Sequence, residues 1–439
     1  MTKQLNTNPQ SSSLNPQCTI IETTPLELLN LYLTDGKSKG DKTTKLYQKF
    51  NSELTWDAIL NKGYQRDLAP LLYYIVNKDG LDSDSKEIAL RHEIKHKLKA
   101  VYNQYLATNL IQFNELEKIL NAFESEGIDV ISLKGVEMAK NYYPDQALRP
   151  MGDIDLLIRK EDMKRAKECL ISHGYGFKSM STFVDEDFYE RKHFHFPYIK
   201  YNATTPIVVE LHQDIAGRSD FINNNIVEFW EKAAPIDDRH KSVLITAKEY
   251  LLLHLFWHTY LNLSNCLYVR LICLIDIALI MRKHKDDIDW DFIEEKSKEW
   301  AIYRQGYFCL YLINQLFDIP YDKKITRTIM PPKHCLRLFD FIMSQIECDI
   351  HALRDPNRLY IRLLILISLN TTNARIKYLF RYNPKASFSK RERLRKKYNL
   401  SSGKAVYIFY IIHPILSTLM GLKWLYKIFL RGGTDKLSV

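Results

Sequence analysis

The chain has 439 residues, of which 46% are hydrophobic and 26% are charged. This composition excludes a disordered or fibrous chain, and the length exceeds the size at which a single core usually stops growing. The formal net charge of +10 is unevenly distributed, because residues 375–397 hold ten Lys or Arg against the single acid Glu392. The rest of the chain is therefore close to neutral.

Residues 1–22 are rich in Ser, Asn, Gln and Thr and show no apolar period, which is typical of a disordered tail. The segment has no basic start followed by an apolar run, so no secretory signal is expected. The 7 cysteines are scattered without a CxxC pair, as expected for buried thiols in a reducing compartment. A cytoplasmic location follows, with peripheral contact to the inner face of the membrane left open.

Residues 23–126 are predicted to form an N-terminal helical region, because apolar residues recur there at helical spacing. Within this region, residues 85–126 contain neither Gly nor Pro. Their absence predicts one long helix or two helices in series, and Gly127 is expected to end it.

Residues 127–220 change in character, since short runs rich in β-branched residues alternate with helix-compatible segments. This alternation predicts a small mixed-sheet core between helical regions, and therefore an α+β fold. The expected strands are 128–133, 153–158, 193–196 and 207–212, and the expected helices are 136–143 and a segment that starts near Glu161 and ends at Gly174.

The pattern returns to helix after the core. Residues 221–374 are predicted to form a C-terminal helical domain, with helices at 246–260, 268–282 and 289–300. Residues 375–439 are predicted to be a basic segment followed by an apolar helix. Its apolar stretch is shorter than the about 20 residues that a membrane span requires. The basic part has three open interpretations: an anchor on an anionic membrane surface, a nucleic-acid contact, or a solvated face beside a core helix.

Residues with catalytic potential gather in the strand that follows Gly152. Residues two apart on a strand point to the same face, so Asp153 and Asp155 are expected side by side. Two such carboxylates can share hard divalent cations such as Mg²⁺ with the oxygens of a triphosphate. An isolated pair of this kind is equally well explained as a solvated strand edge. The neighbouring motifs are therefore needed to choose between a metal site and a solvated edge.

A third carboxylate is expected from the strand at 207–212. Alternation puts Glu210 and His212 on one face of this strand and apolar residues on the other. A carboxylate in the middle of an apolar strand is costly unless it is paired or bound to metal, so metal ligation or proton abstraction is predicted for Glu210. His212 and His195, on the preceding predicted strand, are candidates for acceptor contact.

Phosphate contacts are expected upstream of the acidic pair. Lys134 and Gly135 close a strand and open a helix, a geometry in which backbone N–H groups meet phosphate. The Lys134 ammonium adds a point charge for the triphosphate. Arg149 and Gly152, just before the acidic pair, complete the predicted nucleotide-binding residues.

The ordered set ISLKGVEMAKNYYPDQALRPMGDIDLLI, followed by HFHFPY and VVELH, resembles the DNA polymerase beta-like nucleotidyltransferase superfamily. Within it, the resemblance is to an uncharacterised bacterial family with an LKG turn, an R-x-x-(G/S)-DIDLL strand and a later E-L-H strand. These motifs span about residues 128 to 212. Where the wider superfamily has a Gly-Ser or Gly-Gly turn, this chain has Lys134-Gly135 and a longer insert before Asp153.

The resemblance implies an enzyme that transfers a nucleoside monophosphate from an NTP, such as ATP, to an unidentified acceptor and releases pyrophosphate. It implies Mg²⁺ as the cofactor, two ions being held during turnover by Asp153, Asp155 and Glu210. A small molecule is the favoured acceptor. An RNA-modifying or toxin-like transferase that binds RNA through 375–397, and a catalytically degenerate nucleotide-binding module, are the alternatives.

Two further signals have ordinary explanations. His254 and His258 have a zinc-like spacing on an apparent helix, but the Glu of a zincin motif is absent and the surroundings are apolar. They are predicted to be core or domain-contact histidines. Asp276 occupies a buried-looking helix position, where an ion pair with Arg270 or Arg282 is expected.

Overall fold

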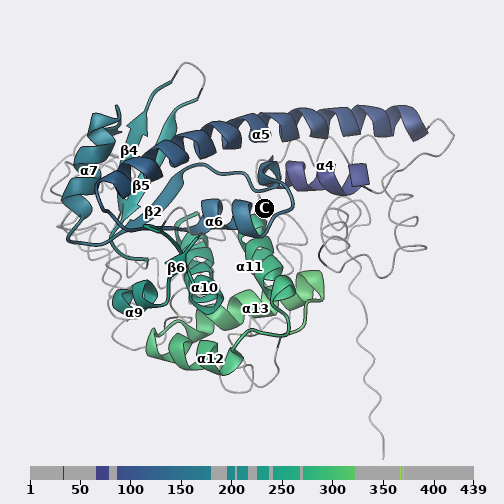
Figure 1. Cartoon of the computed structure of the whole chain (residues 1–439). Helices are drawn as coiled ribbons and strands as arrows, with labels where there is room; N and C mark the ends of the chain where they lie inside the picture. The colour runs from purple at the N-terminus through teal and green to yellow at the C-terminus, as the bar shows by residue number, and fades with distance from the viewer. Residues whose placement is uncertain are drawn as a thin grey trace, which may run out of the picture. The chain divides into compact units, whose positions relative to one another are not determined.

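The computed structural model divides the chain into two compact units, residues 1–351 and 352–439 (Figure 1). The helices and strands given below all belong to the first unit. The basic segment 375–397, the predicted C-terminal helix and the predicted N-terminal tail 1–22 lie outside the described residues. The structure describes residues 33, 66–78, 87–178, 195–202, 205–215, 225–236, 241–266, 270–321, 336, 366 and 369.

Within the described part of the chain, a 7-stranded mixed sheet has the strand order β3-β4-β5-β2-β1-β7-β6. The pairs β2 with β5 and β1 with β7 are parallel, and the remaining pairs are antiparallel. Helices precede and follow this sheet, so the predicted α+β fold is confirmed. The strands are β1 (Val130–Ser132), β2 (Ile154–Ile158), β3 (Gly176–Phe177), β4 (His195–Lys200), β5 (Ile207–His212), β6 (Ala234–Pro235) and β7 (Val243–Ile245).

The long segment without Gly or Pro forms one helix, α5 (Glu87–Ser125). Gly127 follows with a φ of 64°, a left-handed conformation that ends the helix, as predicted. The other described helices are α4 (Ala69–Lys78), α6 (Lys134–Asn141), α7 (Met163–Ser172), α9 (Ile226–Glu231), α10 (Lys248–Cys266), α11 (Leu271–Lys283), α12 (Trp290–Glu299) and α13 (Tyr303–Phe317), with short 3-10 turns η1 (Arg66–Leu68) and η2 (Gln146–Leu148).

One face of the sheet is buried against α5 and α7. Alternate apolar residues of the central strands enter this core, as their two-residue period predicts. The opposite face of β2 and β5 therefore carries the residues that alternate with these core residues along each strand. The core contains Leu116, Ile119 and Phe123 of α5, Met163, Ala166 and Leu170 of α7, and Ile154, Leu156, Ile158, Val209 and Leu211 of the strands.

Strand β4 was predicted to end before Pro197, but it continues through this residue to Lys200. The carbonyl of Pro197 accepts a hydrogen bond from the backbone N–H of Lys178 at 2.9 Å, on the side of β3. In an antiparallel strand the N–H and C=O of one residue point the same way, so the N–H that proline lacks lies on that side too. The missing N–H therefore faces away from β5, and the pairing of β4 with β5 is not interrupted.

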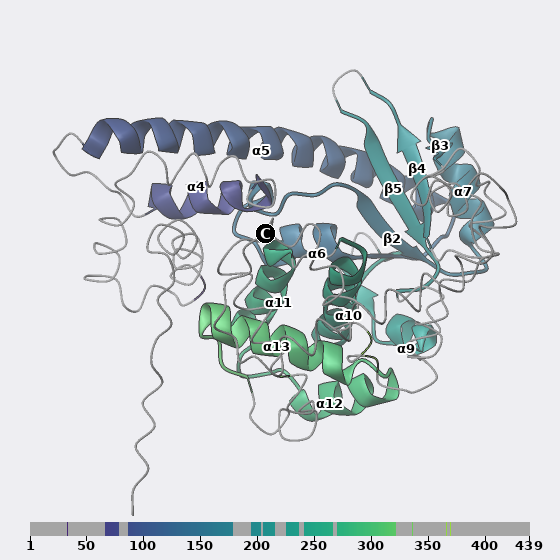
Figure 2. The same ribbon diagram turned by 180° about the vertical axis from the view of Figure 1, so that it is seen from behind.

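The helices after the core, α10 to α13, pack on one another. In both views α10 and α11 lie on the other side of β2 from α5 (Figures 1 and 2). Helix α11 is buried along almost its whole length, from Leu271 to Met281. Among the described helices, none has both the length and the apolar character that crossing a membrane requires.

Candidate active site

Two neighbouring parallel strands bring two of the predicted carboxylates together. Asp155 of β2 is the register partner of Glu210 of β5, so both side chains leave the same face of the sheet. This face is opposite to the core formed with α5 and α7, into which Ile154 and Leu156 point. Asp153 lies just before β2, and the exposed Gly152 precedes it. The structure thus gives the local arrangement that the sequence pattern predicts.

Asp155 is the centre of the polar contacts in this site. The Lys134 ammonium donates a hydrogen bond to Asp155 Oδ1 at 2.8 Å, and His212 Nε2 lies 2.7 Å from the same oxygen. His212 Nε2 also lies 3.6 Å from Glu210 Oε2. One ligand atom from each of Asp155, Glu210 and His212 lies within 4.8 Å of the others. These three residues can therefore hold a metal ion.

Burial and neighbouring charges set the protonation states of the carboxylates. Burial alone would raise the pKa of Asp155, but the Lys134 ammonium and the hydrogen bond from His212 hold it well below its usual value. Repulsion prevails at Asp153, where the charge of Asp155, then burial and the charge of Glu210, raise the pKa to about 7. The site therefore holds more negative charge than its own cations offset, which favours a bound cation.

The turn between β1 and α6 brings Lys134 to the carboxylates. Lys134 has a φ of 46°, a left-handed conformation that residues other than glycine rarely adopt, and its backbone strain is of order 1 kcal/mol. The backbone N–H of Leu133 donates to the Asp155 carbonyl at 3.0 Å, which ties the turn to β2. At Gly135 a Cβ atom would lie 3.3 Å from Met151 Cγ, so glycine suits this close approach. The Lys134 ammonium was predicted to contact a triphosphate, whereas in the structure it binds Asp155.

The two predicted acceptor-contact histidines lie beside the carboxylates. His195 is the register partner of His212, and their ring centroids are 5.5 Å apart. His195 Nε2 lies 3.9 Å from Glu210 Oε1. Glu210 therefore has the His195 imidazole of β4 and the His212 imidazole of its own strand beside it. His193, the other histidine of the predicted strand, lies outside the described residues.

A family model described as "Uncharacterised nucleotidyltransferase" matches residues 52–318, which is more than half of the chain and includes all the residues of the site. The chain belongs to this family. Membership in the uncharacterised nucleotidyltransferase family confirms the family resemblance and the enzyme class read from the motifs. The bacterial branch and the polymerase beta-like superfamily stay predictions. No curated protein and no solved structure is significantly similar to the chain.

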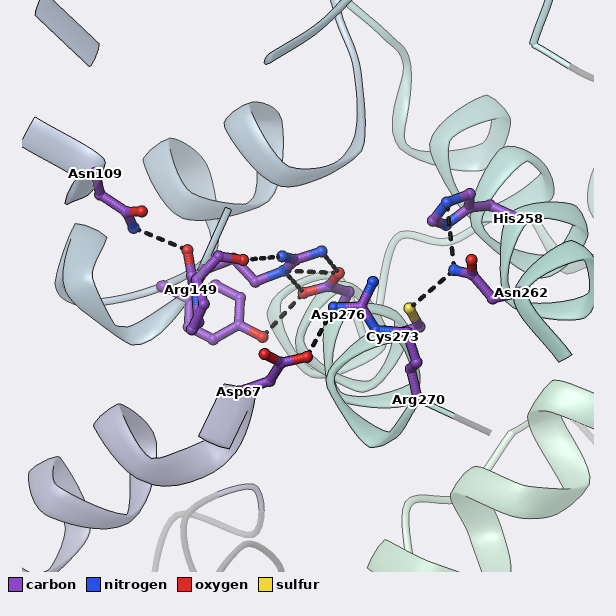
Figure 3. A network of polar contacts seen from close by, with 10 residues as sticks. Asp67, Asn109, Arg149, His258, Asn262, Arg270, Cys273 and Asp276 are labelled. Carbon is purple, nitrogen blue, oxygen red and sulfur yellow. Dashed lines mark hydrogen bonds and ion pairs between the residues drawn. The ribbon is translucent and has the colours of Figure 1, made fainter. Parts of the chain in front are cut away.

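In this nucleotidyltransferase, Arg149 has another partner than the predicted phosphate. Its Nε lies 2.9 Å from Asp276 Oδ1 and its Nη2 lies 2.8 Å from Asp276 Oδ2 (Figure 3). Arg149 is 7% exposed and Asp276 is 0% exposed. The guanidinium therefore joins the core to α11, and this geometry does not support phosphate contact by Arg149. The predicted partners of Asp276, Arg270 and Arg282, were wrong, and Arg270 instead binds Asp67 at 2.7 Å.

The segment that leads into Asp153 is held by polar side chains that the sequence analysis missed. Asn109 Nδ2 donates to the carbonyls of Gln146 at 2.6 Å and Arg149 at 2.9 Å, and Gln112 Nε2 donates to the carbonyl of Met151 at 3.4 Å. Both side chains are buried on α5, at helical positions shared with its apolar core residues. Polar residues at core spacing were the signal that would have indicated them.

His254 and His258 of α10 are not brought into the group of metal-competent residues that the described part of the chain contains. His254 is 1% exposed, and burial first, then the Lys134 charge, lower its pKa to about 3, so its imidazole is neutral. His258 is partly buried, and its Nε2 lies 3.4 Å from Asn262 Nδ2 (Figure 3). These observations agree with the prediction of core histidines and not with a zinc site.

Proposed function

We propose that this protein transfers a nucleoside monophosphate from an NTP to an acceptor and releases pyrophosphate. One observation carries the proposal: Asp155 and Glu210 are register partners on adjacent strands and present their carboxylates on one face. Nucleotidyl transfer needs cations held in this way, because charge that develops on the phosphates must be neutralised. The family match supports the same class of reaction.

The donor set fits a divalent cation, and Mg²⁺ is the ion that we propose. Asp155 and Glu210 offer carboxylate oxygens within 4.8 Å of each other, and oxygen is the ligand that Mg²⁺ prefers. The charges of Asp155 and Glu210 raise the pKa of Asp153, and a bound cation would offset this repulsion. When bound, the ion would neutralise triphosphate charge and lower the pKa of the attacking hydroxyl. Asp153 would complete a site for a second ion during turnover.

The residues of the chain would orient the reactants and accept a proton. In the transfer, the acceptor oxygen forms a bond to the α-phosphorus, and the bond from that phosphorus to the oxygen bridging to the β-phosphorus breaks. The acceptor proton passes to a Glu210 carboxylate oxygen. Burial opposes ionisation of Glu210, but the hydrogen bond from His212 lowers its pKa, so the carboxylate is ionised at neutral pH. The Lys134 ammonium would hold Asp155 in place, the backbone of the turn at Gly135 would face the nucleotide, and His195 would serve the acceptor.

The proposal is tested with each NTP labelled at the α-phosphate, Mg²⁺ and a cell extract. The wild-type protein should label one product, and the Asp153→Ala/Asp155→Ala protein should label none. A small-molecule product agrees with the acceptor class that we favour. An RNA product whose yield falls steeply with added salt would support the alternative in which 375–397 binds RNA. Equal labelling by both proteins would reject the site, and no labelling with any NTP would favour a degenerate module.

The pH dependence of cation binding gives an independent prediction. Asp153 has a pKa of about 7 in the ion-free site, so below pH 7 a proton must leave before this carboxylate can meet a cation. Mg²⁺ affinity should therefore rise by about tenfold per pH unit up to pH 7 and level off above it. Calorimetric titrations at pH 6, 7 and 8 measure this, with Asp153→Asn as the control. The same slope in wild type and control would contradict the prediction.

A further inference from the structure

We infer that His212 is itself a ligand of the catalytic cation, so that one metal position of this site is completed by an imidazole nitrogen. This inference rests on the proposed function, because it concerns the ion proposed there. The sequence pattern had assigned the third ligand to a carboxylate and had given His212 to the acceptor. The structure instead places His212 in the group with Asp155 and Glu210.

The first argument is the spacing of the three ligand atoms. Metal–oxygen and metal–nitrogen bonds of about 2.1 Å at right angles put neighbouring ligand atoms about 3 Å apart. His212 Nε2 lies 2.7 Å from Asp155 Oδ1 and 3.6 Å from Glu210 Oε2, on either side of that value. One ring nitrogen is thus directed at both carboxylates at distances that a shared ion needs. Only small shifts of side chains would bring the three atoms around one cation.

The second argument is the cost of placing His212 where it is. Its residue exposure is 1%, at the end of a strand whose alternate residues enter an apolar core. A buried imidazole is stable when its ring nitrogens meet polar or metal partners. A neutral imidazole carries its hydrogen on either ring nitrogen, so Nε2 can offer a lone pair to an ion. His195, the register partner of His212 on β4, is farther from Glu210, at 3.9 Å, and is not part of the group.

The expected consequence is a preference among divalent ions. Mg²⁺ prefers oxygen ligands, whereas Mn²⁺ accepts a mixed set of oxygen and imidazole nitrogen more readily. We expect the wild-type protein to bind Mn²⁺ about tenfold more tightly than Mg²⁺. Replacing His212 by Gln, which keeps a polar group near the same place, should weaken Mn²⁺ binding by about 10- to 100-fold. Mg²⁺ binding should change by less than about threefold, so most of the preference should be lost.

The decisive measurement is electron spin-echo modulation of Mn²⁺ bound to the full-length protein, since a directly bound ¹⁴N nucleus modulates the echo. The wild type should show this modulation, and His212→Gln should not. In protein whose histidines carry ¹⁵N, the modulation should change to the ¹⁵N pattern, which tests the assignment without altering a buried residue. The matched control is His193→Gln/His195→Gln, which removes the His195 imidazole of β4 and the histidine two positions before it in the sequence, and which should keep the modulation.

The outcomes separate this inference from the proposed function. Mn²⁺ that binds without nitrogen modulation, or modulation lost only in the His193→Gln/His195→Gln protein, would overturn the role of His212 and leave the carboxylate site intact. Mn²⁺ that binds equally well to wild type and Asp155→Asn would instead reject the metal site of the proposed function. If His212→Gln does not fold, the ¹⁵N-histidine experiment on the doubly substituted control still decides the assignment.

Discussion

Replacing Asp155 by asparagine is expected to lower the rate of nucleotidyl transfer by at least about 10³-fold, because this carboxylate lies at the centre of the site. Stabilisation of the transition state by a metal ion is worth several kcal/mol, and about 4 kcal/mol corresponds to a factor of about 10³ in rate. Asp155 contacts Lys134 and His212 and is the register partner of Glu210, so its loss also affects the other two members of the metal-competent group. The rate is measured as label transferred from the α-labelled NTP.

The matched control for this prediction is Asp129→Asn. The Asp129 carboxylate is 43% exposed, 3.6 Å from Arg159, and does not belong to the metal-competent group, so its replacement should change the rate by less than about twofold. Asp155→Asn also leaves the buried Lys134 ammonium without its carboxylate, so the melting temperature of each variant must be compared. A folded Asp155→Asn protein that retains more than about a tenth of the wild-type rate would refute the role of Asp155.

The sequence predicted those parts of the fold and of the site that depend on local pattern. Strand β5 begins and ends at the residues predicted for it, Ile207 and His212, and the Gly- and Pro-free segment forms the single helix α5. Side-chain alternation is a property of any strand, so the shared face of Glu210 and His212 followed from the sequence. That Asp155 stands beside Glu210 required one further assumption, namely that the two strands are neighbours, and the sheet order confirms it.

Features that depend on distant contacts were missed. Strand β7 has only three residues, too few to be recognised from the sequence. It is a strand because it pairs in parallel with β1, more than 100 residues earlier. The partner of Asp276 is separated from it by 127 positions, and several arginines were equally plausible from the sequence alone. Likewise, nothing local distinguishes a lysine that binds a phosphate from one that binds Asp155. In each case the contact that decides the outcome joins elements far apart in the chain, and the local pattern of one sequence does not reveal such contacts.

Replacing Asp276 by asparagine is expected to lower the free energy of unfolding by about 3–5 kcal/mol, the usual cost of removing one partner from a buried ion pair. Asp276 accepts hydrogen bonds from Arg149 and from the Tyr143 hydroxyl, and it is fully buried. Burial raises the pKa of Asp276 and the guanidinium opposes this, which shows that the carboxylate depends on its partner. Urea unfolding followed by tryptophan fluorescence measures the change.

Two comparisons distinguish a buried ion pair from a general loss of charge. Glu294→Gln removes a carboxylate bound to Lys298 at 2.6 Å, but that pair lies at the surface and its loss should cost less than about 1 kcal/mol. The double variant Arg149→Met/Asp276→Leu removes both charges and keeps apolar volume, so it should recover most of the stability lost in Asp276→Asn. If the double variant is less stable than Asp276→Asn, the cost does not come from an unpaired guanidinium, and the ion pair itself contributes net stability at the junction of the core with α11.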